Sequence, residues 1–421
     1  MTHGPGEVVI TGVGLAVPGA STPDALLRRT ACPVTGPDPE PFDTAARIGR
    51  RGHRYKDRAT RLALCAALEA LRDADLLPSD GESDRPADGP ADAPSDSPSD
   101  RETVTVPGDT VGVVASSNLG NLDTACLTTT AIAERSAVDL SPMSLPNASS
   151  NVIASWVAIR HGLRGPNLML CNGPTSGLDA VHWGAALVAA GRVRRVVVVG
   201  AETHNAVVED LLGRSAGELL DGAGALVVEG ARWAEARGAR GVAALGPYER
   251  RAGLTGCVEA LLPDAAAPGV WFTPERYAEG PAGAVPVPRA VPRYDVTGAV
   301  GRASGALGVL QCVAAVGWLA RAAATTGAEP VEPVQRVERV ESAERVESAE
   351  PVEPDAGAGS GTAFGAGPGS ARDPVPVSRQ ALITSGDDTA DAVAGLLLRP
   401  TPDRSHPHPA RAPLISMECS R

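Results

Sequence analysis

The sequence predicts an α/β protein, because buried strand-like segments alternate with helix-like segments along most of its 421 residues. Nearly continuous runs of valine, isoleucine and leucine predict strands that are covered on both faces. Alanine-rich runs with helical spacing predict the helices that cover them. Because strands and helices alternate, we expect a mostly parallel sheet with helices on both sides.

The strands and helices fall into two groups along the chain. In the first 230 residues we expect strands at 8–14, 110–117, 167–172, 194–202 and 225–230, and helices at 57–75 and 176–190. The second group is thinner, with a strand at 270–274, a helix at 305–324 and a strand-turn-strand at 381–398. The sequence therefore predicts two halves, residues 1–230 and 231–400, followed by a flexible tail at 401–421.

Two segments lack the apolar side chains that a packed core needs. Residues 79–108 repeat Asp, Ser and Pro, and residues 328–373 contain the repeat RVESAERVESAE followed by a Gly/Ala/Ser run. Such compositions bury too little apolar surface to offset the entropy of ordering the chain. We expect both segments to be disordered insertions, one in each half.

Composition and charge exclude several classes of protein. The formal net charge is −12, which disfavours nucleic-acid binding because that function needs a concentrated basic face. The seven cysteines are scattered without a C-x-x-C pair, which argues against a disulfide framework and a zinc site. The spacing of Gly12, Gly14 and Gly19 misses the dinucleotide-binding fingerprint. We expect no metal, no cofactor, no membrane segment and a cytoplasmic location.

Several phrases, taken together and in order, resemble the β-ketoacyl synthases of the thiolase superfamily. They are VVITGVGLAVPG, GRRGHRYKDRATRLALCAALEAL, SPMSLPNASSNVIASWVAIRHGLRGPN, AAGRVRRVVVVGAE and DGAGALVVEG. The resemblance is good over residues 7–230 and faint over 295–399. It implies a thiolase-like fold, with two related halves in a five-layer αβαβα arrangement and a shortened second half.

The resemblance places the family's catalytic cysteine on a proline. In that family a cysteine at a sharp strand-to-helix elbow takes the acyl chain as a thioester, and two histidines assist condensation. Here the elbow falls on residues 170–177 and the cysteine's position on Pro174, which has neither a nucleophilic atom nor an N–H. The family's Gly-His and lysine positions correspond to Arg302 and Thr297, and its other histidine loop falls near 270–274, which contains no histidine. The resemblance therefore implies that no catalytic residue remains.

The chain-length factors of type II polyketide synthases show a similar replacement, usually by glutamine. In them Gly-Leu-Asp-Ala follows the replaced cysteine, as residues 177–180 do here. This likeness implies a non-catalytic subunit that pairs with an active ketosynthase, shapes its acyl tunnel and meets an acyl carrier protein. The family dimerises through the strand at 167–172. Residues that would line the interface or the tunnel are Asn121, Leu122, Thr124, Leu127 and Thr128, for which ordinary helix packing is the alternative interpretation.

Two other functions stay open. A ketosynthase-like acyltransferase would use Cys171 or Ser176 as its nucleophile, although a lone cysteine on a buried strand is more often an inert hydrophobic residue. Thr175 and Ser176 also suit the cap of the helix that follows. The other possibility is a scaffold protein that keeps the fold but has no tunnel. His182 and His204 are interpreted as structural histidines.

Arginine clusters are the candidate contact points for an acidic carrier protein. One cluster is Arg192, Arg194 and Arg195, and the other lies in residues 47–61. A solvated surface is the simpler interpretation of each cluster.

Overall fold

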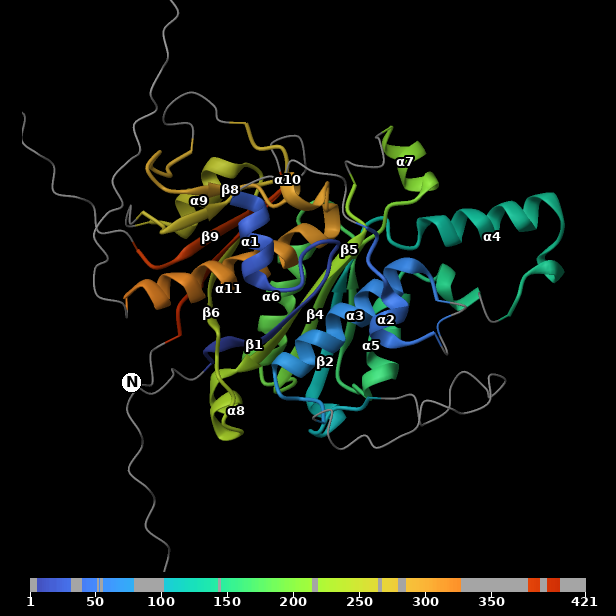
Figure 1. Cartoon of the computed structure of the whole chain (residues 1–421), viewed down its shortest axis with the longest axis horizontal. Helices are drawn as coiled ribbons and strands as arrows, with labels where there is room; N and C mark the ends of the chain where they lie inside the picture. Colours follow the sequence, from blue (N-terminus) through green and yellow to red (C-terminus); the bar gives the residue numbers. More distant parts are fainter. Residues whose placement is uncertain are drawn as a thin grey trace, which may run out of the picture.

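The computed structural model describes residues 6–31, 40–50, 53, 56–78, 102–142, 145–213, 219–263, 267–278, 285–326, 378–386 and 392–401. Within these ranges ten strands form a sheet in the order β3-β2-β4-β5-β1-β6-β10-β9-β7-β8 (Figure 1). The strands are β1 (Val8–Ala16), β2 (Val111–Ser116), β3 (Asn167–Leu170), β4 (Arg195–Glu202), β5 (Gly222–Gly230), β6 (Ala243–Arg251), β7 (Val270–Phe272), β8 (Arg293–Tyr294), β9 (Ala381–Ser385) and β10 (Val393–Arg399).

The sheet contains the same topology twice. Numbered from its own first strand, each set of five strands has the order 3-2-4-5-1, and the two sets meet at β1 and β6. Strands β2 and β7 are parallel to both of their neighbours, whereas β5 and β10 are antiparallel to theirs. Only Val9 with Ala244 and Ile10 with Ala243 join the two sets across β1 and β6. The α/β class predicted from the sequence is confirmed.

The prediction of a mostly parallel sheet was wrong, because the sheet is mixed. Strand β5 runs antiparallel to both β4 and β1, and β10 does the same between β9 and β6. Continuous apolar sequence indicates burial on both faces, and an antiparallel strand covered by helices satisfies that condition equally well. The sequence pattern therefore identified buried strands but not their directions.

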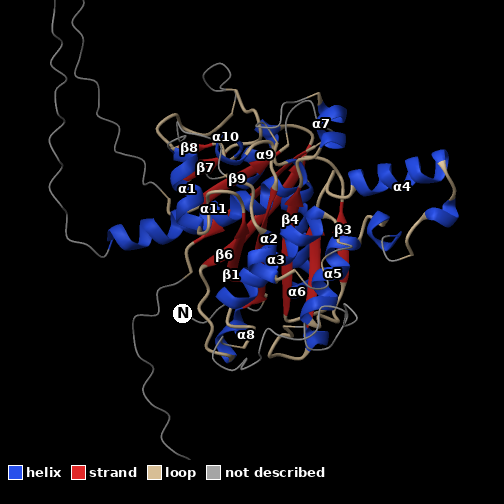
Figure 2. Ribbon diagram, turned by 45° about the vertical axis from the view of Figure 1, so that its right-hand side comes forward, coloured by secondary structure: helices blue, strands red, loops and turns tan. Residues whose placement is uncertain are grey.

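The principal helices are α1 (Pro23–Ala31), α2 (Thr44–Ile48), α3 (Arg58–Asp73), α4 (Leu122–Glu134), α5 (Val152–His161), α6 (Ser176–Ala189), α7 (Ala206–Leu212), α8 (Ala231–Ala236), α9 (Leu254–Leu261), α10 (Thr297–Val300) and α11 (Leu307–Thr326). Alternate residues of β4 separate two cores: Val196 and Val198 face a core containing α6 and α11, while Val197 and Val199 face one containing α3. Helix α9 packs on β6 and β10. Figure 2 shows helices on both sides of the strands.

Helices α6 and α11 cross at a pair of glycines. A Cβ added to Gly308 would lie 2.8 Å from the carbonyl carbon of Gly177, and a Cβ on Gly177 would lie 2.7 Å from the backbone nitrogen of Gly308. Real Cβ atoms do not approach a backbone so closely, so the crossing requires residues without side chains at both positions.

Helix α11 is also the one long apolar helix in the described part of the chain. Residues Ser304–Ala324 are long and apolar enough to cross a membrane, but most of this stretch is buried inside the protein. A helix that is hydrophobic all round is typical of the core of a large domain as well as of a membrane span. Its burial between strands identifies α11 as a core helix.

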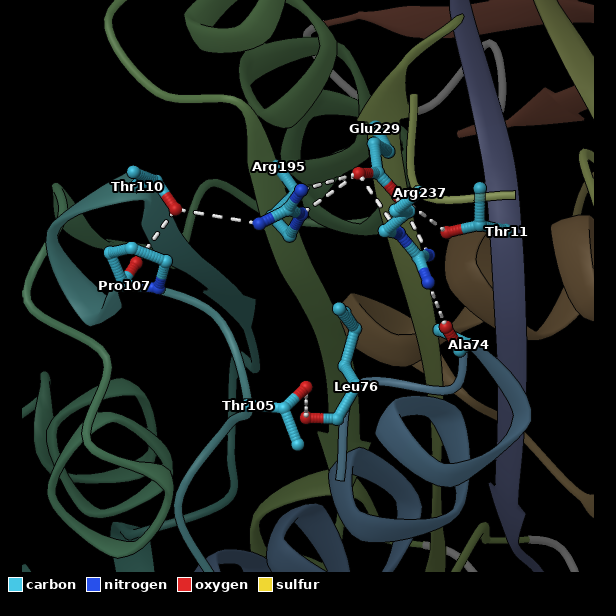
Figure 3. A network of polar contacts seen from close by, with 9 residues as sticks. All are labelled: Thr11, Ala74, Leu76, Thr105, Pro107, Thr110, Arg195, Glu229 and Arg237. Carbon is cyan, nitrogen blue, oxygen red and sulfur yellow. Dashed lines mark hydrogen bonds and ion pairs between the residues drawn. The ribbon is translucent and has the colours of Figure 1, made fainter. Parts of the chain in front are cut away.

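A buried ion network holds the amino-terminal end of β4 (Figure 3). The carboxylate of Glu229 is fully buried and accepts from Arg195 Nη2 at 2.7 Å and Arg237 Nη2 at 2.8 Å. Arg237 Nη1 also donates to the carbonyl of Ala74 at 2.7 Å, and Thr11 donates to Glu229 at 3.4 Å. One carboxylate thus balances two guanidinium groups and links β4, β5 and the segment after α3.

The predicted insertions fall largely outside the described residues. Residues 79–101 and 327–377 lie there, as do 402–421 of the predicted tail. Residues 102–108 of the first predicted insertion are part of the fold, which corrects its boundary. The backbone N–H of Val104 donates to His161 O and that of Thr105 to Leu76 O, so this segment is bound to α5 and to the end of α3.

Because two histidines near this segment, His161 and His53, are buried, we expect the protein to lose stability in acid. Burial lowers the pKa of His161 to about 4, and Arg160 and Arg72 act in the same direction. Because this folded-state pKa lies below the ordinary value of 6.5, the stabilisation is complete above pH 6.5 and is lost as the pH falls towards 4. Between pH 7 and pH 5, His161 alone should cost about 2 kcal/mol of unfolding free energy.

Denaturant unfolding at both pH values measures this loss. The loss of unfolding free energy should be smaller in His161→Gln than in the unaltered protein, and an equal loss in both proteins would contradict the assignment. Burial also lowers the pKa of His53 to about 4, and His53 remains in both proteins.

Candidate functional site

The elbow between β3 and α6 is built around Gly173 and Pro174. Strand β3 ends at Leu170, and Gly173 has φ +86°, a conformation that favours glycine. The chain then turns through Pro174 and Thr175 into α6. The carbonyl of Pro174 accepts a hydrogen bond from the Ser385 hydroxyl at the end of β9. The turn of the predicted elbow is therefore present, with a residue at its apex that carries no nucleophile.

Asn118, which follows β2, fixes the elbow from the side. Its Nδ2 donates to Gly173 O at 2.8 Å and to Ser304 Oγ at 2.9 Å. Its Oδ1 lies 3.0 Å from the hydroxyl of Ser176 and 3.3 Å from the Gly173 nitrogen. The hydroxyl of Ser176 also accepts from the Asn172 N–H at 2.9 Å. One amide side chain thus ties the elbow to the segment that precedes α11.

Glu202 lies at the carboxyl end of β4, beneath Asn118. Its carboxyl accepts from the backbone nitrogens of Asn118 at 2.7 Å, Gly305 at 3.0 Å and Leu119 at 3.1 Å, and from the Ser117 hydroxyl at 3.1 Å. Burial nevertheless raises the pKa of Glu202 to about 7, against the effect of those four donors. Glu202 therefore holds the loop after β2 and the segment just before α11 in place through these hydrogen bonds.

A second buried carboxylate, Asp179, lies on the first turns of α6. It accepts hydrogen bonds from Asn172 Nδ2, from Thr175 Oγ1 at 2.9 Å and from the Tyr248 hydroxyl. The ring of Tyr248 stacks on His182 with centroids 4.1 Å apart. Burial raises the pKa of Tyr248, and its bond to Asp179 acts in the same direction, so the phenol stays a donor. These contacts join α6 to β6, and all three donors share Asp179 as their acceptor.

Among the described residues, neither alternative nucleophile donates a hydrogen bond to a basic side chain. Cys171 was expected on a buried strand, but it is exposed just beyond the end of β3. Partial desolvation raises the pKa of its thiol, and the Glu202 carboxylate acts in the same direction, so the reactive thiolate is disfavoured. Ser176 is fully buried and its hydroxyl has only oxygen acceptors, from Asn118, Asn172 and Gly173. The expected cap is also absent, since Thr175 is the N-cap residue without a side-chain capping bond.

The other degenerate positions lie on the segment before α11. Thr297 begins α10, and its hydroxyl donates to Asp295 Oδ1 at 2.6 Å. Arg302 donates through Nε to Glu275, which also accepts from the backbone nitrogen of Ala303 at 3.3 Å. The predicted histidine-free loop at 270–274 includes β7, whose Trp271 is fully buried.

The five tunnel or interface candidates belong to α4 or to the residue before it. Figures 1 and 2 show α4 projecting from the body of the protein. Ala131 is the one buried residue on this helix, whereas Leu127 is 68% exposed. Val138, in the short helix that follows, is 90% exposed. The side chain of Asn121 donates to Ser149 O at 3.1 Å. The structure thus leaves an apolar surface on a projecting element.

The cluster of Arg192, Arg194 and Arg195 differs from a simple surface patch. Arg195 is buried and paired with Glu229, so it is not available to a partner. Arg194 and Arg232 are exposed, and their guanidinium groups lie 4.0 and 4.9 Å from the ring of Trp233. His204 lies 3.6 Å from Glu209. In the described ranges no group of three His, Cys, Asp or Glu residues could hold a metal ion.

Sequence reasoning missed the positioning residues Asn118, Glu202, Tyr248 and Ser385. A signal existed for two of them, because Asn118 and Glu202 follow or end the adjacent parallel strands β2 and β4. The carboxyl ends of parallel strands are where α/β folds gather functional side chains. Tyr248 and Ser385 come from the second set of strands, whose position the first half of the sequence does not indicate.

Comparisons with known proteins agree with this geometry. Residues 31–220 match the family model described as the β-ketoacyl synthase N-terminal domain. A 3-oxoacyl-[acyl-carrier-protein] synthase 2 from Vibrio harveyi is 26% identical over 222 residues, covering 47% of this chain and 48% of the relative. The Vibrio cholerae protein of the same name is 23% identical over 275 residues, covering 56% and 60%. The chain thus spans about half the length of the curated relatives that it matches.

Solved structures match over a longer range. A structure described as the ishigamide ketosynthase/chain length factor has a TM-score of 0.60 at 21% identity, covering 94% of this chain and 99% of its own. A β-ketoacyl synthase from Burkholderia phymatum has a TM-score of 0.59 at 16% identity, covering 94% and 100%. A type II polyketide synthase ketosynthase with its acyl-carrier protein gives 0.61 at 13%, covering 94% and 99%. At such identities the match shows the fold. This protein therefore has a thiolase-like ketosynthase fold, and its residues 31–220 resemble a β-ketoacyl synthase N-terminal domain.

Proposed function

We propose that this chain is a catalytically inactive, cytoplasmic subunit of the chain-length-factor type, which pairs with an active ketosynthase and shapes its acyl tunnel. The observation that carries the proposal is Pro174 at the apex of a well-formed elbow. A proline there can neither form a thioester nor donate an N–H to an oxyanion. The surrounding hydrogen bonds hold the turn between β3 and α6 in place, with no nucleophile at its apex.

The exposed apolar surface of α4 and its neighbours supports a partner subunit. Monomeric proteins rarely leave several large apolar side chains exposed together. Here Leu127, Ile132, Val138 and Leu145 are each at least 47% exposed on α4 and the two short helices after it. Strand β3 is a sheet edge, so its outer backbone groups can pair with a strand of another chain. The structures to which this chain is similar include one described as a ketosynthase/chain length factor.

The rival acyltransferase lacks support in the geometry. It requires a thiolate or an activated hydroxyl, but Cys171 has a raised pKa and Ser176 donates to oxygen atoms. The scaffold hypothesis differs from our proposal only in the acyl tunnel. It predicts that the chain binds a ketosynthase without changing the length of its product.

Co-expression with any ketosynthase that is encoded beside this chain should test the pairing. We expect one copy of each chain in a heterodimer, detected by native mass spectrometry of the complex recovered on a tag on this chain. Leu127→Asp and Val138→Asp should lower the recovered ketosynthase about tenfold or more, because a charge placed in a buried apolar interface is costly.

Ala236→Asp is the matched control, since it adds the same charge at an exposed position on α8, far from α4 in Figure 1. It should leave the recovery unchanged. A well-behaved monomer, or a homodimer that ignores the ketosynthase, would refute the subunit proposal. Variants that pair normally would refute the role of α4. The length of the polyketide product, measured with and without this chain, separates a tunnel-shaping subunit from a scaffold.

A further inference from the structure

A small cavity lies next to the elbow and has no part in the interface proposed above. Its volume is about 40 Å³, and it is bounded by the loop after β2, the end of β4, α7, the segment before β5 and the segment before α11. A bound water needs roughly 10–15 Å³, so the cavity has space for about three waters and for no more than a small ligand.

The walls of the cavity are mainly apolar. Leu119, Val208, Leu212 and Leu219 supply aliphatic surface from the loop after β2, from α7 and from the segment before β5. Pockets for small molecules generally combine such walls with a few placed polar groups. An aliphatic chain is therefore favoured over a sugar or a nucleotide.

Arg302 supplies the charge. It lines the cavity, and its side chain is 28% exposed. Among the described residues only its Nε has a hydrogen-bonding partner, the carboxylate of Glu275, which leaves both terminal nitrogens available. Glu275 also accepts from the backbone nitrogens of Ala303 and Ser304, and Leu220 N donates to Arg302 O at 3.0 Å. The Arg302 guanidinium is thus anchored through Nε on Glu275, and its terminal nitrogens are donors suited to a carboxylate.

Glu202 is the other ionisable group in the lining. Burial raises its pKa to about 7, so below neutral pH it is mostly protonated and does not repel an anion. The oxygens of Glu202 already accept four hydrogen bonds from the protein, so they have little capacity left to bind a cation. With Glu202 protonated, Arg302 and Glu275 balance each other, so the hydrogen-bonding capacity of the Arg302 terminal nitrogens, and not a net positive charge, recommends a carboxylate.

We propose that this cavity binds a free short-chain monocarboxylate, such as acetate or propionate, with its carboxylate on the Arg302 guanidinium and its methyl end among Leu119, Val208 and Leu212. The proposal goes beyond the subunit function, because it requires no acyl transfer and no partner. The resemblance implies that a catalytic residue has been lost at the position of Arg302. The proposal gives Arg302 a role in binding instead.

Titration of the full chain with propionate labelled with ¹³C at the carboxyl carbon tests the proposal by NMR. We expect saturable binding, at least tenfold weaker in Arg302→Gln and tighter at pH 6 than at pH 8. Propanol and propylammonium should bind at least tenfold more weakly, and octanoate should be excluded by size. Val208→Trp, which fills the cavity, should abolish binding while Arg302 remains.

Arg250→Gln is the matched control, because it removes an exposed guanidinium that does not line the cavity. It should bind propionate as the unaltered chain does. Equal binding by the unaltered chain and Arg302→Gln, absence of binding by the unaltered chain, or preference for the amine would overturn the proposal. These measurements compare variants of this chain without a ketosynthase. Their outcomes therefore do not depend on whether the chain acts as a ketosynthase subunit.

Discussion

Replacing Glu229 by glutamine should lower the free energy of unfolding by about 3–5 kcal/mol. Two guanidinium groups, those of Arg195 and Arg237, converge on this fully buried carboxylate. The amide keeps the volume but removes the negative charge, so both cations would be left in a low-dielectric core without compensation. Removing one partner of a buried ion pair destabilises the fold much more than the intact pair stabilises it relative to apolar residues of similar volume.

Denaturant unfolding monitored by circular dichroism measures the effect. Glu69→Gln is the matched control, since Glu69 pairs with Arg47 and Arg72 at partly exposed positions. It should cost about 1 kcal/mol or less. If Glu229→Gln unfolds at the same denaturant concentration as the control, the network of Figure 3 does not stabilise the fold as described.

Gly308→Ala should destabilise the protein by about 3 kcal/mol, although alanine favours helices. Its Cβ would meet the backbone of α6 at Gly177 and Leu178, and backbone cannot rotate away as a side chain does. Because α6 begins at the elbow, the shift would also displace Pro174 and Ser176.

Gly256→Ala provides the control for helix propensity. Gly256 lies in α9 and has nothing within 4 Å of an added Cβ, so the same substitution there should stabilise by up to about 1 kcal/mol. Thermal unfolding of both variants gives the comparison. Equal and positive effects at the two positions would mean that α6 and α11 are not in the close contact described.

Much of the first half of the fold could be predicted because its signals are local. The valine run of β4 and the helix-forming run of α3 identify themselves within one segment, and the observed bounds differ by only a few residues from those expected. Strand β6 was missed, because AALGPYERR contains Gly, Pro and charged residues that ordinarily argue against a strand. Strand directions were missed because burial does not determine them.

The candidate site was harder to predict where it joins distant segments. The elbow and Pro174 could be located from contiguous sequence. Arg195 looked like a surface charge, because its partner Glu229 lies 34 residues away on another strand. The cavity beside Arg302 draws its walls from five parts of the chain between Leu119 and Ser304, so no local pattern indicates it.

The mass of the intact chain after incubation with acyl carrier protein thioesters tests most directly whether the elbow is inert. With Pro174 at the apex and no activated nucleophile beside it, we expect the mass to remain that of the unmodified chain, while an active ketosynthase treated alongside gains one acyl group. An acyl adduct mapped by peptide fragmentation to Cys171 or Ser176 would contradict the account and identify the chain as an acyltransferase.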